Sequence, residues 1–213
     1  NGKARILAGQ SNYEQPDKAF VQPAAVRGFE LGDTLSSTGF TLPGSPSTTG
    51  PLASADVDGD GDLDLFVGGR IVAARYPEPA DSFLYLNQNG ELKPDPVNNP
   101  ALKKLGLVSG AVFGDLDLDG DSDLVLALEW GLVMVLRNDA GKFTDATEAF
   151  GLHRHKGWWN SVALGDFNGD GLDDVFVAKG NLVHGRQNEI LLADGDGGFT
   201  STLLARSDYS RGG

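Results

Sequence analysis

The chain contains no cysteine, so the sequence excludes thiol catalysis, thiolate metal sites and disulfides, and cysteine usage gives no signal about the compartment. Basic residues are also scarce, because 17 Lys and Arg stand against 30 Asp and Glu, which gives a formal net charge of −13. A nucleic-acid phosphate backbone binds a Lys- and Arg-rich face. The charge balance therefore argues against a nucleic-acid partner and favours cations or cationic partners.

Long apolar runs are missing as well. No stretch approaches the ~18 consecutive apolar residues of a membrane-spanning helix, and the first residues, from Asn1, show neither the apolar segment nor the cleavage site of a signal peptide. We expect a soluble chain with no membrane span, and we interpret the start at Asn1 as that of a processed or excised piece. With 213 residues, 40% of them hydrophobic, the chain is long enough to bury a core.

Glutamate is scarce too, because 23 of the 30 acidic residues are Asp and only 7 are Glu. Asp is a turn and ligand residue, whereas Glu is the usual residue of a solvated helix surface. Fourteen of the Asp fall in three nine-residue windows, 56–64, 115–123 and 166–174. Each window has Asp at position 1, Asp or Asn at position 3, Asp at 5, Gly at 6 and Asp at 9.

This spacing predicts a cation site in each window, because alternate side chains of a tight loop converge on one point and the residue at position 7 adds its backbone carbonyl. Solvated acidic turns are the plain alternative. Like charges 4 Å apart, however, repel by about 4 kcal/mol at an effective dielectric constant of 20, so such a loop needs a cation to stay ordered. Carboxylate-rich loops without His or Cys favour Ca²⁺. An EF-hand is excluded, because its Glu at position 12 is replaced by Val67, Leu126 and Val177.

The windows belong to a longer repeat. They begin at residues 56, 115 and 166, so they recur after 59 and 51 residues, close to one four-stranded propeller blade with its loops. Small-residue stretches suited to an inner strand precede each window, at 51–55, 109–114 and 160–165, and hairpin patterns follow, at 82–92, 132–143 and 189–199. The sequence predicts an all-β fold: β-propeller blades of four antiparallel strands, with a calcium-binding loop between the first and second strands.

The loops resemble those of FG-GAP/VCBS repeats, the calcium-binding blades of integrin α-subunit heads and of many secreted bacterial β-propellers, over about residues 51–201. Segments 126–131 (LALEWG) and 157–161 (GWWNS) are most similar to bacterial proteins related to cartilage acidic protein, of the ASPIC/UnbV type. The resemblance implies Ca²⁺ in three sites and a location outside the cytosol, whether extracellular, at the cell surface or periplasmic. It also implies a role in adhesion or ligand binding. By position, the implied ligands are Asp56, Asp58, Asp60, Asp62 (carbonyl) and Asp64; Asp115, Asp117, Asp119, Asp121 (carbonyl) and Asp123; and Asp166, Asn168, Asp170, Leu172 (carbonyl) and Asp174.

The pattern divides the chain into four parts. We expect an incomplete N-terminal blade and loop at 1–50, with strand candidates at 4–9 and 25–31 but no acidic loop. Blades follow at 51–107, 108–157 and 158–213, the last with the start of a further unit. Because propellers of this family usually have about seven blades, we expect part of a larger propeller, or a segment completed by another chain.

One cluster outside the loops is a candidate ligand-binding site. His153, His155, Trp158, Trp159 and Asn160 lie beside Arg154 and Lys156, and an exposed Trp pair next to basic side chains could stack a sugar ring or hold an acidic glycan. The alternative is that both Trp side chains pack between blades while the basic residues lie in a solvated loop. Glu129 and Trp130 follow a strand, and we favour a structural role for them over the alternative that they line an inter-blade groove.

We therefore expect a non-enzymatic, calcium-stabilised propeller segment that serves as an extracellular adhesion or ligand-binding scaffold. Its expected partners are a protein or carbohydrate outside the cell, and self-association is a further option. An alternative is the propeller of a carbohydrate-active enzyme, resembling a polysaccharide lyase, that uses residues 153–160. A third hypothesis is an architectural module that polymerises.

Overall fold

The computed structural model describes residues 5–11, 24–31, 34–180 and 188–203. The chain forms two compact units, residues 1–109 and 110–213, and each is considered by itself. Apart from a single 3₁₀ turn, η1 (Leu152–Arg154), the regular elements of the described ranges are β-strands, and all of the paired registers are antiparallel. No helix in these ranges is long and apolar enough to cross a membrane. The prediction of an all-β fold built from antiparallel blades is confirmed.

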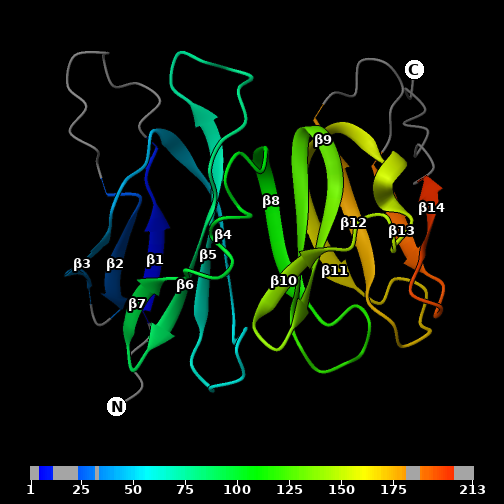
Figure 1. Cartoon of the computed structure of the whole chain (residues 1–213), viewed down its shortest axis with the longest axis horizontal. Helices are drawn as coiled ribbons and strands as arrows, with labels where there is room; N and C mark the ends of the chain where they lie inside the picture. Colours follow the sequence, from blue (N-terminus) through cyan, green and yellow to red (C-terminus); the bar gives the residue numbers. More distant parts are fainter. Residues whose placement is uncertain (1–4, 12–23, 32–33, 181–187, 204–213) are drawn as a thin grey trace, which may run out of the picture. The chain divides into compact units, whose positions relative to one another are not determined.

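The first unit contains two sheets (Figure 1). A three-stranded sheet has the order β1 (Arg5–Gly9), β2 (Val26–Leu31) and β3 (Leu35–Leu42). The second sheet is a four-stranded blade with the order β4 (Ser47–Ala55), β5 (Asp64–Val72), β6 (Phe83–Gln88) and β7 (Glu91–Pro94). β3 leads into β4, the first strand of its blade, so β1, β2 and β3 correspond to the second, third and fourth strands of a blade.

The second unit carries the next two blades. One consists of β8 (Leu107–Gly114), whose first residues still belong to the first unit, with β9 (Asp123–Asp139) and β10 (Lys142–Asp145). The other consists of β11 (Lys156–Gly165), β12 (Asp174–Lys179), β13 (Glu189–Ala193) and β14 (Phe199–Leu203), which pair in that order. β9 and β11 also pair with each other, over Glu129–Leu132 and Lys156–Trp158, so the strands of both blades form one hydrogen-bonded sheet.

β9 supplies two strands of its blade, and the hairpin pattern expected at 132–143 covers only the second of them and the start of β10. The backbone N–H of Asn138, near its end, donates to a carboxylate oxygen of Asp123, its first residue, over 2.8 Å. β9 therefore folds back on itself, and the midpoint of the two residues lies at Trp130–Gly131. Trp130 has a positive φ of 58°, a left-handed backbone that suits such a tight turn. The acidic loops 115–122 and 166–173 consequently lie at the edge of the unit opposite to this turn (Figure 1).

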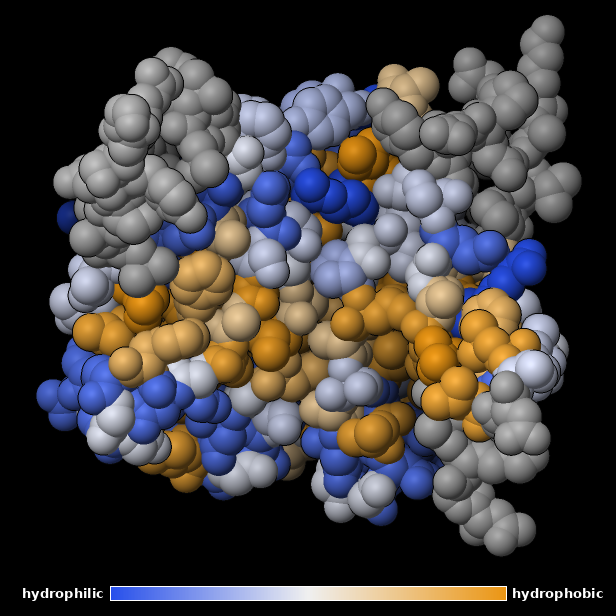
Figure 2. Space-filling view, turned by 180° about the vertical axis from the view of Figure 1, so that it is seen from behind, coloured by the Kyte–Doolittle hydropathy of each residue, from blue (hydrophilic) through white to orange (hydrophobic). Residues whose placement is uncertain are grey.

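The core of the second unit lies where the strand faces of its blades meet. Small residues let the inner strands approach closely: a Cβ at Gly110 of β8 would lie 2.7 Å from the backbone nitrogen of Val162 in β11. The buried members of the core are Val125, Ala127, Val133, Val135, Phe150, Leu152, Trp159, Val162, Val175, Val177 and Leu191. A smaller core in the first unit joins Val26 and Leu42 to Leu65, Val67 and Tyr85. Hydrophobic residues occupy the middle of the visible face, and hydrophilic residues lie above and below them (Figure 2).

Candidate metal centres in the acidic loops

Each acidic loop connects the first and second strands of a blade, as predicted. The loops run from β4 to β5, from β8 to β9 and from β11 to β12, and the Asp at position 9 is the first residue of the second strand in each case. These three residues, Asp64, Asp123 and Asp174, are at most 1% exposed. Because a buried carboxylate must be hydrogen-bonded, paired with a cation or protonated, the contacts of these side chains decide what the loops can do.

The Asp at position 9 bridges three parts of its blade. One carboxylate oxygen of Asp64 accepts the N–H of Val57, at position 2 of the loop, over 2.9 Å, and the other accepts the N–H of Asn87 in the third strand over 2.7 Å. The same pair of bonds recurs in the other two loops, from Leu116 and Asn138 to Asp123 and from Phe167 and Ala193 to Asp174. Each oxygen keeps a second lone pair, so these bonds leave room for a cation.

The Asp at position 1 shapes the turn. Asp56 accepts the N–H of Gly59 over 2.9 Å with one oxygen and that of Gly61 over 2.8 Å with the other. Asp166 makes the equivalent contacts in the third loop, and these backbone hydrogen bonds hold its pKa below the usual value. Gly61, at position 6, has a φ of 90°, which explains why glycine stands there.

Carboxylates converge in the first two loops. Oxygen atoms of Asp56, Asp58 and Asp64, at positions 1, 3 and 9, lie within 4.8 Å of one another, and those of Asp115, Asp117 and Asp123 do the same. Position 5 does not join either group. Instead, Asp60 accepts the N–H of Asp62, and Asp119 accepts that of Asp121, each over 2.9 Å. The first two loops thus bring together three of the five residues implied as ligands in each.

The third loop differs at position 3. The amide of Asn168 donates to Asp170 over 2.8 Å and accepts the N–H of the same residue over 2.9 Å. Asn168 thus makes hydrogen bonds to both the side chain and the backbone of Asp170 without adding a negative charge. Position 7 is Leu172, whose N–H donates to Asp170 over 2.9 Å. Only a loop with Asp at position 3 therefore gathers three carboxylates in this structure.

The electrostatics of the first two loops favour a cation. Burial raises the pKa of Asp123 to about 6, and the neighbouring charges of Asp117 and Asp119 add to the rise. The hydrogen bonds from Asn138 and Leu116 lower this pKa but do not offset the effect of burial. Burial also raises the pKa of Asp64 and, with the charge of Asp119, that of Asp117. Since these carboxylates are destabilised as anions, a hard divalent cation with oxygen ligands fits both groups.

The cluster at 153–160 is divided between core and surface. Trp159 is 1% exposed, its indole N–H donates to the carbonyl of His155 over 3.2 Å, and the Lys179 ammonium lies 4.8 Å from its ring centroid. Neighbouring residues of a strand point to opposite faces, so the interpretation of an exposed Trp158–Trp159 pair is wrong, and packing is confirmed for Trp159. His153 and Asn160 are exposed and His155 is partly buried.

Trp158 has a different aromatic partner. Its ring stacks on that of Trp130, with the centroids 4.9 Å apart and the planes at 22°. Trp130 is 59% exposed, and its left-handed backbone costs a non-glycine residue about 1 kcal/mol. The sequence favoured a structural role for Trp130 over the lining of an inter-blade groove and did not indicate this stack. The local signal for the turn is Gly131 between two apolar segments, because glycine is a preferred residue of tight hairpin turns.

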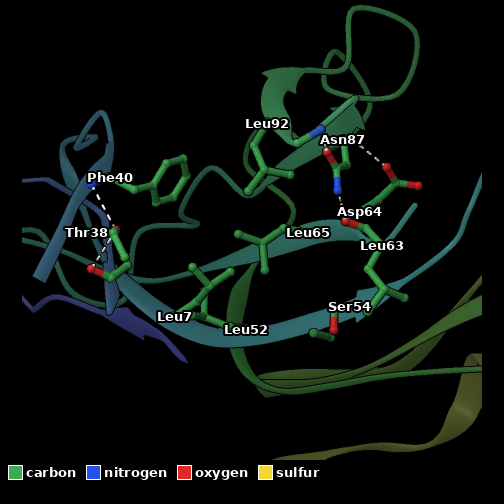
Figure 3. Close-up of a pocket in the computed structure, with 13 residues that line it drawn as sticks. Leu7, Thr38, Phe40, Leu52, Ser54, Leu63, Asp64, Leu65, Asn87 and Leu92 are labelled. Atoms are coloured by element: carbon green, nitrogen blue, oxygen red, sulfur yellow. Dashed lines mark hydrogen bonds between the residues drawn. The ribbon is translucent and has the colours of Figure 1, made fainter. Parts of the chain in front are cut away.

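A cavity of about 470 Å³ lies in the first unit, next to the first acidic loop (Figure 3). Its wall is mainly apolar, with Leu7 and Phe40 from the three-stranded sheet and Leu52 and Leu65 from the following blade. Asp64 and Asn87 line it near the loop, joined by the hydrogen bond to Asp64 described above. The cavity therefore touches the buried end of the candidate metal centre.

One comparison with known protein families agrees with the repeat. Residues 115–177 match the model of a family described as FG-GAP-like repeat, a range that contains the second loop, β9 and the third loop. No curated protein matches the chain. The chain is similar to a solved lectin from Agrocybe aegerita, described for its specific recognition of non-reducing terminal N-acetylglucosamine, with 19% sequence identity and a TM-score of 0.47. The similarity covers 85% of this chain and 47% of that one, so the chain spans about half the length of the lectin. Residues 115–177 are thus similar to an FG-GAP-like repeat, within a fold of antiparallel β-blades.

Proposed function

We propose that the chain is a non-enzymatic propeller segment whose first two acidic loops bind Ca²⁺ and whose exposed loops form a ligand-binding scaffold outside the cytosol. The observation that carries the proposal is the convergence of three carboxylates in each of these loops, one of them buried at the start of the second strand. The FG-GAP-like repeat supports the same assignment. Closeness to ASPIC/UnbV-type proteins stays a prediction.

The chain's own residues would hold the ion as follows. Asp56, Asp58 and Asp64 would supply carboxylate oxygens in the first loop, and Asp115, Asp117 and Asp123 in the second. A bound ion would neutralise charges that burial and mutual repulsion destabilise. The hydrogen bonds of Asp64 and Asp123 to the loop and to the third strand would then hold the ordered loop against the blade.

A weak site would suffice outside the cell. Extracellular modules bind Ca²⁺ with dissociation constants of about 10⁻⁴ to 10⁻³ M, which millimolar calcium fills. Such weak sites would stay empty in the cytosol. We therefore propose that the protein works where calcium is plentiful, whether extracellular, at the cell surface or in the periplasm. Isothermal titration of the metal-free protein with Ca²⁺ and Mg²⁺ measures this affinity directly. A dissociation constant below about 10⁻⁶ M for Ca²⁺ would remove the argument for an extracellular location.

The third loop provides a built-in control for the metal test. Asn168 keeps the hydrogen bond to position 5 while removing a charge, so Asp58→Asn and Asp117→Asn copy a residue that this chain already tolerates at position 3. We expect each variant to fold and to bind Ca²⁺ at least about tenfold more weakly at its own loop, because a ligand charge is lost. The reverse change, Asn168→Asp, should strengthen binding at the third loop.

Thermal unfolding in EDTA and in CaCl₂ provides the second measurement. Ca²⁺ at 100 times its dissociation constant stabilises a site by about 2.7 kcal/mol, which raises the melting temperature by several degrees. Asp139→Asn, an exposed change at the end of β9 with the same loss of charge, should leave this gain intact. An identical melt of the wild-type protein in EDTA and in CaCl₂ would refute the proposal.

A further inference from the structure

The tip of the β9 hairpin presents a large apolar side chain to solvent in an unusual backbone setting. Gly131 of β9 pairs with Gly157 of β11 and Glu129 pairs with Trp158, so Trp130 is an extra residue of β9 at a β-bulge. Bulges re-aim a side chain, and here the bulge combines with the left-handed backbone to expose most of the Trp130 ring. A backbone outlier that holds an exposed aromatic ring indicates a functional surface.

The exposed ring is also held in place. Trp130 stacks on Trp158, which is only partly buried. The carbonyl of Trp158 accepts the N–H of Gly180 over 2.8 Å, and its neighbour Trp159 is anchored in the core. A rigid aromatic surface loses little conformational entropy on binding. The Trp130–Trp158 stack therefore forms a preorganised platform in the second unit.

Lys156 lies two residues before Trp158 on β11 and brings a positive charge to the platform, while the acidic Glu129, which pairs with Trp158, is 8% exposed. Arg154 and Lys156 are exposed, and Lys156 pairs with Leu132, two residues from Trp130. Neither makes an ion pair with another residue in the described ranges. His153, in the same segment, is exposed as well. In a chain with a net charge of −13, this is a local site for an anionic group.

We propose that the Trp130–Trp158 platform binds an anionic saccharide of the uronic-acid class. The apolar C–H face of a pyranose ring stacks on an indole, and a ring carboxylate pairs with Arg154 or Lys156. A polyphosphate would meet the repulsion of the strongly acidic chain, whereas an oligosaccharide with one carboxylate per ring carries less charge. The inference names the ligand class of the scaffold and rests on that proposed function.

The test uses the whole chain and two trisaccharides with α-1,4 linkages, trigalacturonate and neutral maltotriose. Isothermal titration and indole fluorescence should show binding of trigalacturonate at concentrations up to about 1 mM and weaker binding of maltotriose. Trp130→Asn keeps a residue type that tolerates the left-handed backbone, removes the ring, and should lower the affinity about tenfold or more. The double change Arg154→Gln/Lys156→Gln should lower the affinity for trigalacturonate but not for maltotriose.

Matched controls make each outcome decisive. Lys103→Gln/Lys142→Gln alters the charge equally at exposed positions outside the platform and should not affect binding. Equal binding by Trp130→Asn and the wild-type protein, or no binding of trigalacturonate, would overturn the proposal. A wild-type dimer that becomes monomeric in Trp130→Asn would also overturn it, by assigning the platform to a second copy. Melting in EDTA and CaCl₂ is measured on the same samples, so failure of the metal assignment is distinguished from failure of the saccharide assignment.

Discussion

Asp123→Asn separates the structural role of the buried carboxylate from its proposed role as a metal ligand. Without metal, the aspartate anion is unfavourable: its pKa rises from 3.8 to about 6, and at 1.36 kcal/mol per pKa unit this corresponds to about 3 kcal/mol of destabilisation at pH 7. Asparagine removes this penalty. It also replaces one acceptor oxygen by an NH₂ group, which leaves the N–H of Leu116 or Asn138 without its partner at a cost of about 1–3 kcal/mol.

The two contributions nearly cancel in the metal-free protein. We expect the free energy of unfolding of Asp123→Asn in EDTA to lie within about 2 kcal/mol of the wild-type value. In CaCl₂ the result changes, because the variant loses a ligand charge and with it the stabilisation from the second loop, about 2.7 kcal/mol at 100 times the dissociation constant.

Urea unfolding at pH 7, in EDTA and in CaCl₂, measures both quantities, with Asp139→Asn as the control for charge. Two results would contradict the reasoning. If Asp123→Asn keeps the full stabilisation by Ca²⁺, then Asp123 is not a ligand. If it loses more than about 4 kcal/mol in EDTA, then the carboxylate stabilises the metal-free protein and the burial penalty is misjudged.

Three further predictions follow from the same geometry. The pKa of Asp123 is about 6 in the folded protein and 3.8 in the unfolded chain, so between these pH values only the folded protein binds a proton there. In EDTA, the contribution of Asp123 to stability should therefore increase as the pH falls from about 6 to 3.8. Melting curves recorded at several pH values measure this effect, and CaCl₂ should suppress it. Gly110→Ala should destabilise the second unit by about 1–3 kcal/mol because its Cβ would meet the backbone of β11, whereas Gly165→Ala, with its nearest contact at 3.8 Å, should be tolerated in the same denaturation assay. Trp159→Ala should cost about 3–5 kcal/mol and Trp130→Asn less than about 1 kcal/mol, because only the first is a core residue.

Much of the fold could be predicted because each blade repeats a strong local pattern. The acidic windows fix where the first strand ends and the second begins, and Asp64, Asp123 and Asp174 open β5, β9 and β12. The hairpin patterns at 82–92 and 189–199 contain β6 and β13 in full and end near the beginning of β7 and β14. These features depend on neighbours in sequence, where turn residues and alternation are informative.

The features that sequence reasoning missed depend on tertiary pairing. The stack of Trp130 on Trp158 requires the register between β9 and β11, which no local pattern specifies. The turn at Trp130 also contradicts propensity, because a bulky aromatic residue is disfavoured in the left-handed region. Whether Trp158 or Trp159 faces the core depends on the register of the strand, and a shift of one residue exchanges the two faces.

The repeated bonds of the Asp at position 9 explain why the acidic pattern alone does not distinguish a metal site from a turn. All three loops use this residue to join position 2 to the third strand, so the fold requires it with or without a cation. The Asp at position 1 likewise caps backbone N–H groups in the first and third loops. Position 3 is different, because Asn168 performs the local hydrogen bonding without a charge. The negative charge of Asp58 and Asp117 is therefore not needed for this hydrogen bond, and the proposed cation would give that charge a role.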